Sequence, residues 1–281
     1  MLYNVKKRMR EGKSMYSGVL SAKYSEQMIG KSNHYHDGHQ LLYIVKGSID
    51  VTVDGKRESV SDGTLLLFSR FEEHSITVKG DVYKRYSLRI SPDFVNAHDN
   101  EMLFGLLVNR APGFCRALSL CENKAVTEGC FQRLIAEYQG KSLFREEMLD
   151  ALLRELLIEI CRQMPQQMLS EKSANARLVY RLQQRFENNY RENVSLGRLA
   201  AEFHMSISHL SHLFKETTGM SVMEYLNGCR MLAAKKYLAT TDLSVGEIVT
   251  MCGFSDDSNF SRNFKQKTGM TPSEFRRNYR A

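Results

Sequence analysis

The sequence predicts an α+β protein in two parts: an N-terminal antiparallel β-barrel followed by helices, and a C-terminal all-α domain with two helix-turn-helix units. Three observations lead to this prediction. Short apolar runs with a strand-like period of two fill residues 26–90, a helical period replaces them after Pro92, and a segment near the C-terminus occurs twice.

The strand signals begin after a polar, basic stretch at residues 1–25. Residues 41–45 form an apolar, β-prone run, and residues 49–53 alternate apolar and polar side chains up to Asp54-Gly55, a dipeptide typical of tight hairpins. Further short runs follow at 65–68 and 76–90. Several short strands at regular spacing are typical of a small antiparallel barrel or jelly roll.

Helical periodicity then predicts helices at 93–109, 124–139 and 142–163. In the last of these, leucine and isoleucine recur every three or four residues, at positions 149, 152, 153, 156, 157 and 160. This stripe either packs against the barrel or forms a helix–helix seam in a homodimer, and the sequence does not separate the two. The polar stretch at 165–175 lacks periodicity and is the predicted linker.

The C-terminal part of the chain repeats itself. Ser211, Phe214, Lys215, Thr218, Gly219, Met220 and Glu224 recur as Ser261, Phe264, Lys265, Thr268, Gly269, Met270 and Glu274, a constant offset of 50. Upstream, Leu199, Met205 and Ser206 match Ile248, Phe254 and Ser255 at an offset of 49. We therefore place the difference of one residue in a turn, where a change of length is tolerated.

Each copy carries the signals of a helix, a turn and a second helix. In the first, a helix at 196–203 precedes a turn at 204–205, and Ser206 caps a helix that Gly219 ends. In the second, Ser244 and Glu247 form a capping box, Gly253 permits the turn, and a helix runs from about 256 to 268. A long helix at about 222–239 joins the copies. It would span about 27 Å, close to the ~34 Å of one DNA turn.

The second helices divide into an apolar face and a polar face. Leu210 and Phe214 in one, and Phe260 and Phe264 in the other, lie four apart and are expected to be buried. The opposite faces carry short polar residues that can reach base edges in a major groove. They are Ser208, Ser211 and His212, then Ser258, Asn259 and Arg262. Two ordinary amphipathic helices with solvated faces are the alternative, which does not explain matching caps and stops.

Composition narrows the protein class. Of 281 residues, 42% are hydrophobic and 25% are charged, as in globular proteins. Residues 174–281 hold 15 basic and 10 acidic side chains, which suits a polyanionic partner but also a solvated basic surface. The six cysteines form no CxxC pair, and the chain shows neither a secretion signal nor an apolar run of about 20 residues. We expect a cytoplasmic protein with reduced thiols.

The second copy closely resembles the signature of the AraC/XylS family of transcriptional regulators. The resemblance rests on CGFSD at 252–256, FSRNFK at 260–265 and the residues GMTP and FR within 269–276, and it covers about 175–281. It implies that both second helices are recognition helices in adjacent major-groove segments, and it adds Asp257 to the base-edge candidates. Because phosphates repel a carboxylate, Asp257 either accepts from a cytosine amino group or caps its own helix, and we favour capping. Val249 stands where the family usually has a small residue.

The N-terminal part is similar to the cupin-like sensor domains of many such regulators. His34, His36, Gln40 and His74 follow the cupin outline, with Asp54-Gly55 between them. Metal-binding cupins have a glutamate where Gln40 stands, and a neutral amide weakens a divalent-metal site, so no metal is expected. We favour a pocket for a small polar ligand, formed by His34, His36, Gln40, Tyr43 and His74. The same histidines could instead only satisfy hydrogen bonds at the barrel mouth.

The resemblance implies four segments: a cupin-like sensor domain at 1–110, a helical dimerisation segment at 111–165, a linker at 166–175 and an AraC-type DNA-binding domain at 176–281. Its helix-turn-helix units are expected at about 196–217 and 244–268. The implied function is a sequence-specific transcriptional activator controlled by a small effector, such as a sugar or related metabolite. Expected partners are promoter DNA, RNA polymerase and a second copy, with no cofactor, catalytic residue or membrane. A constitutive DNA binder and a metal-dependent cupin enzyme remain the alternatives.

Overall fold

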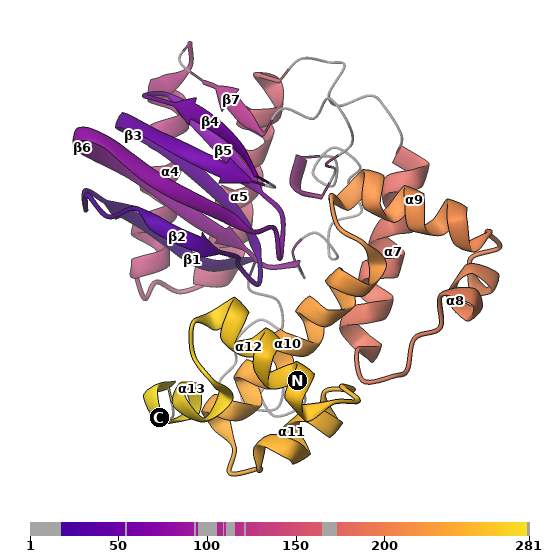
Figure 1. Ribbon diagram of the computed structural model, residues 1–281. Coiled ribbons are helices and arrows are strands. Elements are labelled where there is room, and N and C mark those ends of the chain that lie inside the picture. Colours follow the sequence, from indigo (N-terminus) through magenta and orange to yellow (C-terminus); the bar gives the residue numbers. More distant parts are fainter. Residues whose placement is uncertain are drawn as a thin grey trace. The chain divides into compact units, whose positions relative to one another are not determined.

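A computed structural model describes residues 18–53, 55–92, 94, 106–108, 110, 116–120, 122–164 and 173–279, with side chains from 178 onward in the last range. The chain divides into two compact units. The N-terminal unit comprises residues 1–109 and 113–173, and the C-terminal unit comprises residues 110–112 and 174–281. The antiparallel sheet of the first and the helices of the second confirm the predicted fold class (Figure 1).

The N-terminal unit is built on one seven-stranded antiparallel sheet (Figure 1). Its strands are β1 (Val19–Ser25), β2 (Lys31–His34), β3 (His39–Val53), β4 (Lys56–Val60), β5 (Thr64–Phe68), β6 (His74–Ile90) and β7 (Ala117–Ser119). Their order is β1-β6-β3-β5-β7, with β2 also paired to β6 and β4 to β3. The hairpin expected at 54–55 is present, because Val53 pairs with Lys56 across it.

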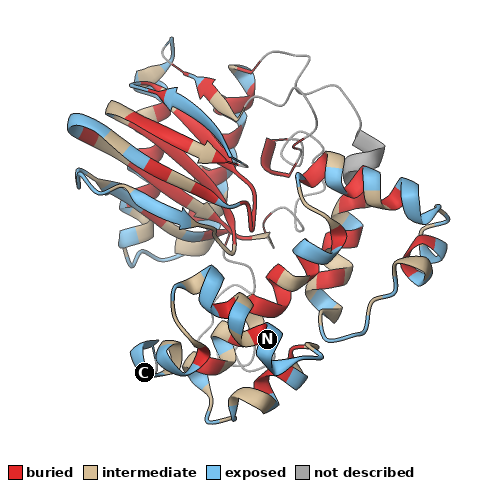
Figure 2. Ribbon diagram, viewed as in Figure 1, coloured by how far each residue is buried: buried red, intermediate tan, exposed pale blue. Residues whose placement is uncertain are grey.

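Alternation along β3 separates two environments. Successive side chains of a strand point to opposite faces, so Leu42 and Ile44 lie on one face and Leu41 and Tyr43 on the other. The first face forms a buried apolar cluster with Phe68 and residues of β4 and β6. Figure 2 shows the central strands as mostly buried. The face that carries Leu42 is called the inner face below.

Two helices cover the opposite face of the sheet (Figure 1). They are α4 (Lys124–Gln139) and α5 (Arg145–Arg162), close to the predicted 124–139 and 142–163. Phe131 of α4 stacks on Tyr43 at 5.8 Å between ring centroids. The apolar stripe of α5 is core, since Leu149, Leu153, Leu156, Leu157 and Ile160 are at most 1% exposed. The stripe is therefore not a seam between copies. The helix expected at 93–109 falls largely outside the described residues.

The C-terminal unit consists of helices. They are α7 (Ser173–Asn189), α8 (Leu196–Glu202), α9 (Ile207–Thr218), α10 (Val222–Thr240), α11 (Val245–Met251), α12 (Asp257–Thr268) and α13 (Pro272–Tyr279). The predicted linker, 166–175, thus ends inside α7, and its first residues lie outside the described part of the chain. Among the helices described, none has the length and apolar character needed to cross a bilayer.

Candidate functional site

The two turns, between α8 and α9 and between α11 and α12, have the same backbone. Met205 N donates to Ala200 O at 2.8 Å, and Phe254 N donates to Val249 O at 3.1 Å, a bond 49 positions later. The residue before each donor is left-handed: His204 has φ +53° and Gly253 has φ +81°. A non-glycine residue in this conformation is uncommon and strained. The repeat seen in the sequence is therefore a repeat of local geometry, even where residue types differ.

The caps of α9 and α12 show where the extra residue sits. The side chain of Ser206 accepts from His209 N at 3.2 Å, and the side chain of Asp256 accepts from Asn259 N at 2.9 Å. The structural partner of Ser206 is therefore Asp256, not Ser255, which is the extra residue. The expectation that Asp257 caps its own helix is wrong, because Asp256 takes that place. Asp257 is the first helical residue, where the helix dipole favours a negative charge.

The stops of both helices also match. Gly219 and Gly269 each have φ +76°, and each donates its backbone N–H to a lysine carbonyl at 2.8 Å. The Thr218 hydroxyl donates to Phe214 O and the Thr268 hydroxyl to Phe264 O, both at 2.7 Å. Both helices thus begin and end by the same means, as the spacing predicted.

The outer faces of α9 and α12 carry the predicted base-edge candidates. Ser208, His212, Asp257, Ser258, Asn259 and Arg262 are exposed, and Ser211 is half-buried. Leu210, Phe214, Phe260 and Phe264 are at most 1% exposed. Figure 2 shows the exposed sides of these two helices. Among the described residues, Arg262 forms no ion pair, whereas His212 lies 3.6 Å from Glu216.

One helix, α10, contributes to the hydrophobic cores of both helix-turn-helix halves of the C-terminal unit. Near its N-terminus Tyr225 packs against Phe214 at 5.6 Å and against Phe186 of α7 at 6.3 Å between ring centroids. Near its C-terminus Ala234 and Leu238 join the cluster that holds the buried side chains of α11 and α12. The contribution of α7 to this core was not predicted, although Val179, Leu182 and Phe186 have helical spacing and are at most 1% exposed.

Gly253→Ala is expected to lower the free energy of unfolding of the C-terminal unit by about 2 kcal/mol or more. The left-handed φ strains any Cβ, and here the Cβ would also lie 2.7 Å from Arg191 O. Gly219→Ala is the matched control, because its φ is similar but nothing lies within 4 Å of the added atom. Urea denaturation measures both losses. Equal losses would show that the close approach to Arg191 is unimportant.

In the N-terminal unit, three of the predicted ligand-binding residues form a cluster. His34 ends β2, His36 follows it, and His74 begins β6, directly opposite His34. One ring nitrogen of each lies within 4.8 Å of those of the other two. The His74 ring stacks on Phe68 at 3.9 Å between centroids, which places the cluster on the inner face.

The protonation of these histidines follows from their surroundings. His34 Nδ1 lies 2.8 Å from Ser32 O, and His74 Nδ1 lies 3.0 Å from Glu72 O. A carbonyl oxygen only accepts, so both Nδ1 atoms carry the proton and both Nε2 atoms keep a lone pair. Burial lowers the pKa of His36 to about 3 and that of His74 to about 4, and it also lowers the pKa of His34. All three rings are thus neutral at pH 7.

The other two predicted ligand residues lie on different faces of the sheet. Gln40 lies on the inner face with Leu42, paired to Phe68 in register, and its amide nitrogen donates to Ser87 Oγ at 3.1 Å. Tyr43 lies on the opposite face against α4, so the structure does not bring it to the histidine cluster.

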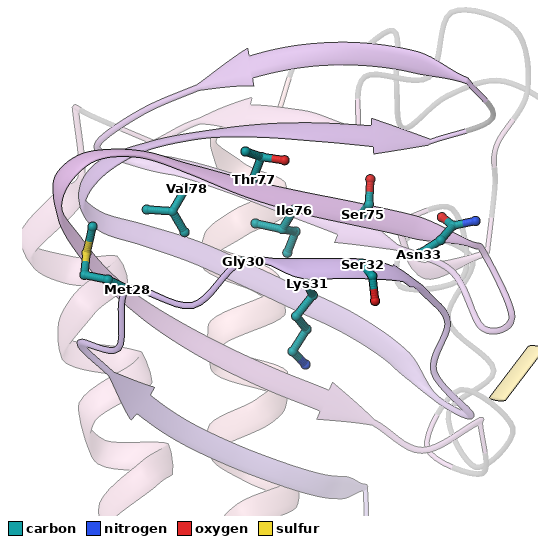
Figure 3. Close-up of a pocket in the computed structure, with 9 residues that line it drawn as sticks. All are labelled: Met28, Gly30, Lys31, Ser32, Asn33, Ser75, Ile76, Thr77 and Val78. Atoms are coloured by element: carbon teal, nitrogen blue, oxygen red, sulfur yellow. The ribbon is translucent and has the colours of Figure 1, made fainter. Parts of the chain in front are cut away.

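An open groove lies between β2 and β6 (Figure 3). Its lining residues are Met28, Gly30, Lys31, Ser32, Asn33, Ser75, Ile76, Thr77 and Val78. None of the five predicted ligand residues lines it, although His34 and His74 are the sequence neighbours of Asn33 and Ser75. The groove therefore runs along the same pair of strands as the histidine cluster without including it.

Comparisons with known proteins match both units. The model of the AraC-like ligand binding domain matches residues 19–157, and that of a helix-turn-helix domain matches residues 199–278. The uncharacterized HTH-type transcriptional regulator YdiP of Escherichia coli is 25% identical over 88% of this chain and 82% of its own length. The HTH-type transcriptional activator RhaS of E. coli is 24% identical over 86% of both. The crystal structure of ToxT from Vibrio cholerae has a TM-score of 0.57 at 16% identity, covering 92% of this chain and 96% of that one, a likeness of fold.

Proposed function

Because the chain belongs to the AraC/XylS family of transcriptional regulators, with an N-terminal ligand-binding domain, we propose that α9 and α12 are its two DNA-reading helices. The chain is a DNA-binding regulator under ligand control. The observation that supports the proposed reading surface is the duplicated turn, cap and stop, which present two polar helix faces in the same way. Helices of this kind enter the major groove with their N-terminal residues on base edges.

The side chains of these faces differ in what they can recognise. Arg262 can form a bidentate pair with guanine, and Asn259 can pair with adenine if it releases Asn263, whose amide nitrogen donates to it at 3.1 Å. Ser208, Ser211, His212 and Ser258 can donate to or accept from base edges or phosphates. Asp257 can accept from a cytosine amino group at the start of α12. The side chains of α12 therefore discriminate between bases better than those of α9.

Arg262→Ala is expected to weaken binding to the promoter site by about 1–3 kcal/mol and to relax the base preference at one position. Arg262→Lys is the matched variant, since lysine keeps the charge but lacks the planar fork. Competition binding with operator variants in full-length protein measures both. If Arg262 contacts only phosphate, the lysine variant keeps wild-type affinity and the base preference of neither variant changes, which would contradict base reading.

The finer parts of the function are proposals of the same kind. We propose that a small effector, such as a sugar or related metabolite, binds near His34, His36, Gln40 and His74, and that the regulator activates transcription through RNA polymerase in the cytoplasm. Effector control requires that the effector bind two arrangements of the protein with different affinity. No enzymatic activity is proposed, in keeping with transcriptional regulators among the relatives.

We also propose a homodimer, formed through the outer face of α5. Met148 and Ile158 on this face are 50% and 39% exposed, and Ala151 between them is exposed as well. They recur at helical spacing beside the buried stripe, as a helix–helix seam requires. This interface differs from the leucine stripe considered first, because the leucines of that stripe are buried in the core of a single chain.

A further inference from the structure

The histidine cluster leaves three buried nitrogens without a protein partner. The Nε2 atoms of His34, His36 and His74 are buried and have no hydrogen-bond partner among the described residues. His74 is only 1% exposed. A buried polar atom without a partner costs about 1–3 kcal/mol, so three at one place call for an explanation. A metal ion accepts all three lone pairs at once when His36, like His34 and His74, carries its proton on Nδ1.

We infer that His34, His36 and His74 bind one divalent transition-metal ion through their Nε2 atoms. Two nitrogens on the same zinc ion lie at most about 4.2 Å apart, because Zn–N distances are about 2.1 Å. One ring nitrogen of each histidine lies within 4.8 Å of the others, so side-chain rotations must close these distances by up to about 1.4 Å to reach the ~3.4 Å of a tetrahedral site. The inference deepens the effector site of the proposed function, because the ion would offer an open position to a small effector, and it rests on the proposed function only in that respect.

The surroundings of the cluster are those of a metal site. A metal-binding histidine usually donates its other ring N–H to a carbonyl or carboxylate, which fixes the ring and its tautomer. His34 does so to Ser32 O and His74 to Glu72 O, at 2.8 and 3.0 Å. The stack of Phe68 on His74 holds the His74 ring in place at the start of β6. These contacts leave the Nε2 lone pairs of His34 and His74 available to a metal ion.

The donor set selects the kind of metal. Three neutral imidazoles suit Zn²⁺, Co²⁺, Ni²⁺ or Cu²⁺, whereas Mg²⁺ and Ca²⁺ require oxygen ligands. Three protein ligands leave at least one position for water or an anionic molecule. Gln40, on the inner face, has a buried amide oxygen with no partner among the described residues. The histidines alone supply the site, so the amide at position 40 does not prevent it.

Zinc titration of the full-length protein tests the inference. After treatment with a chelator and its removal, Zn²⁺ is added in competition with a chromophoric chelator, and Co²⁺ is added separately to record its visible spectrum. We expect one ion per chain and a cobalt spectrum without the charge-transfer bands of thiolate ligands. His34→Gln and His36→Gln, both at half-buried positions, should each weaken binding by at least about 100-fold, above the 10–100-fold typical of lost outer-shell partners.

His204→Asn is the matched control, because His204 lies outside the cluster and asparagine tolerates its positive φ. It should bind zinc as the wild type does, and thermal unfolding shows that each variant is folded. Failure of the wild type to take up one ion, or uptake unchanged in both cluster variants, overturns the inference. DNA binding is measured on the same preparations: its loss with intact zinc uptake contradicts the proposed function alone, and its retention without zinc uptake contradicts the metal site alone.

Discussion

Leu153→Asp is expected to unfold the N-terminal unit, with a loss of at least about 4 kcal/mol, rather than to release folded monomers. Leu153 is 0% exposed and lies on the side of α5 that faces the sheet and α4. A Cβ added to Gly18 would lie only 3.4 Å from Leu153 Cδ2, so the packing around it is tight. Aspartate would remove the apolar contacts and bury a carboxylate without a partner. Circular dichroism with thermal unfolding measures the loss.

Ile158→Asp is the control on the same helix. Ile158 is 39% exposed, so aspartate there should change the free energy of unfolding by less than about 0.5–1 kcal/mol. If the proposed seam is correct, this variant is a folded monomer by light scattering. A folded, monomeric Leu153→Asp protein would instead show that the leucine stripe forms the dimer interface, and it would contradict the packing described above.

Phe264→Ala is expected to destabilise the second helix-turn-helix by about 3–5 kcal/mol and to abolish specific DNA binding. The Phe264 ring is fully buried, with ring centroids of Phe260 and Phe275 at 5.5 and 5.4 Å. Its removal leaves a cavity between α12 and α13, because hydrogen bonds such as that from the Thr268 hydroxyl to Phe264 O hold the helix in place. Denaturation and promoter binding of the full-length protein measure the two effects.

Phe264→Leu separates volume loss from loss of the aromatic ring, and it should cost distinctly less than the alanine variant. Phe214→Ala makes the same change 50 positions earlier, against Phe186 and Tyr225. Similar losses in both alanine variants are expected if the two halves are built alike. A Phe264→Ala protein with wild-type stability and affinity would show that this aromatic cluster does not position α12.

Much of the C-terminal unit follows from sequence because its signals are local. A capping serine three residues before a glutamate, or a glycine after a helix, acts through neighbouring backbone groups, so Ser221 with Glu224 and Ser244 with Glu247 form the boxes their spacing predicts. The start of α12 is predicted only to within one residue, because Asp256 and Asp257 are both suitable N-caps. The geometry of the preceding turn determines that Asp256 is the cap. Likewise, nothing in residue type marks His204 as the equivalent of Gly253.

The N-terminal site depends on strand pairing, which sequence specifies less directly. His34 and His74 are 40 positions apart and meet because β2 pairs with β6 in one register. No local pattern encodes that pairing, so only the resemblance to cupin-like domains grouped these histidines, and the approach of their ring nitrogens comes from the fold. The sequence does predict that Tyr43 lies away from Gln40. The two are three residues apart on one strand, and an odd separation places their side chains on opposite faces of the sheet.

The sharing of α10 between two cores has a consequence for how this regulator can evolve. Each residue added to or removed from the middle of that helix would turn one end against the other by about 100° and shift it by about 1.5 Å. If α9 and α12 read DNA as proposed, their outward faces would then fall out of phase on a duplex. Under that proposal the number of residues in α10 sets the spacing of the binding site, so exchange of surface side chains changes the preferred operator with less disruption than a change in the length of α10.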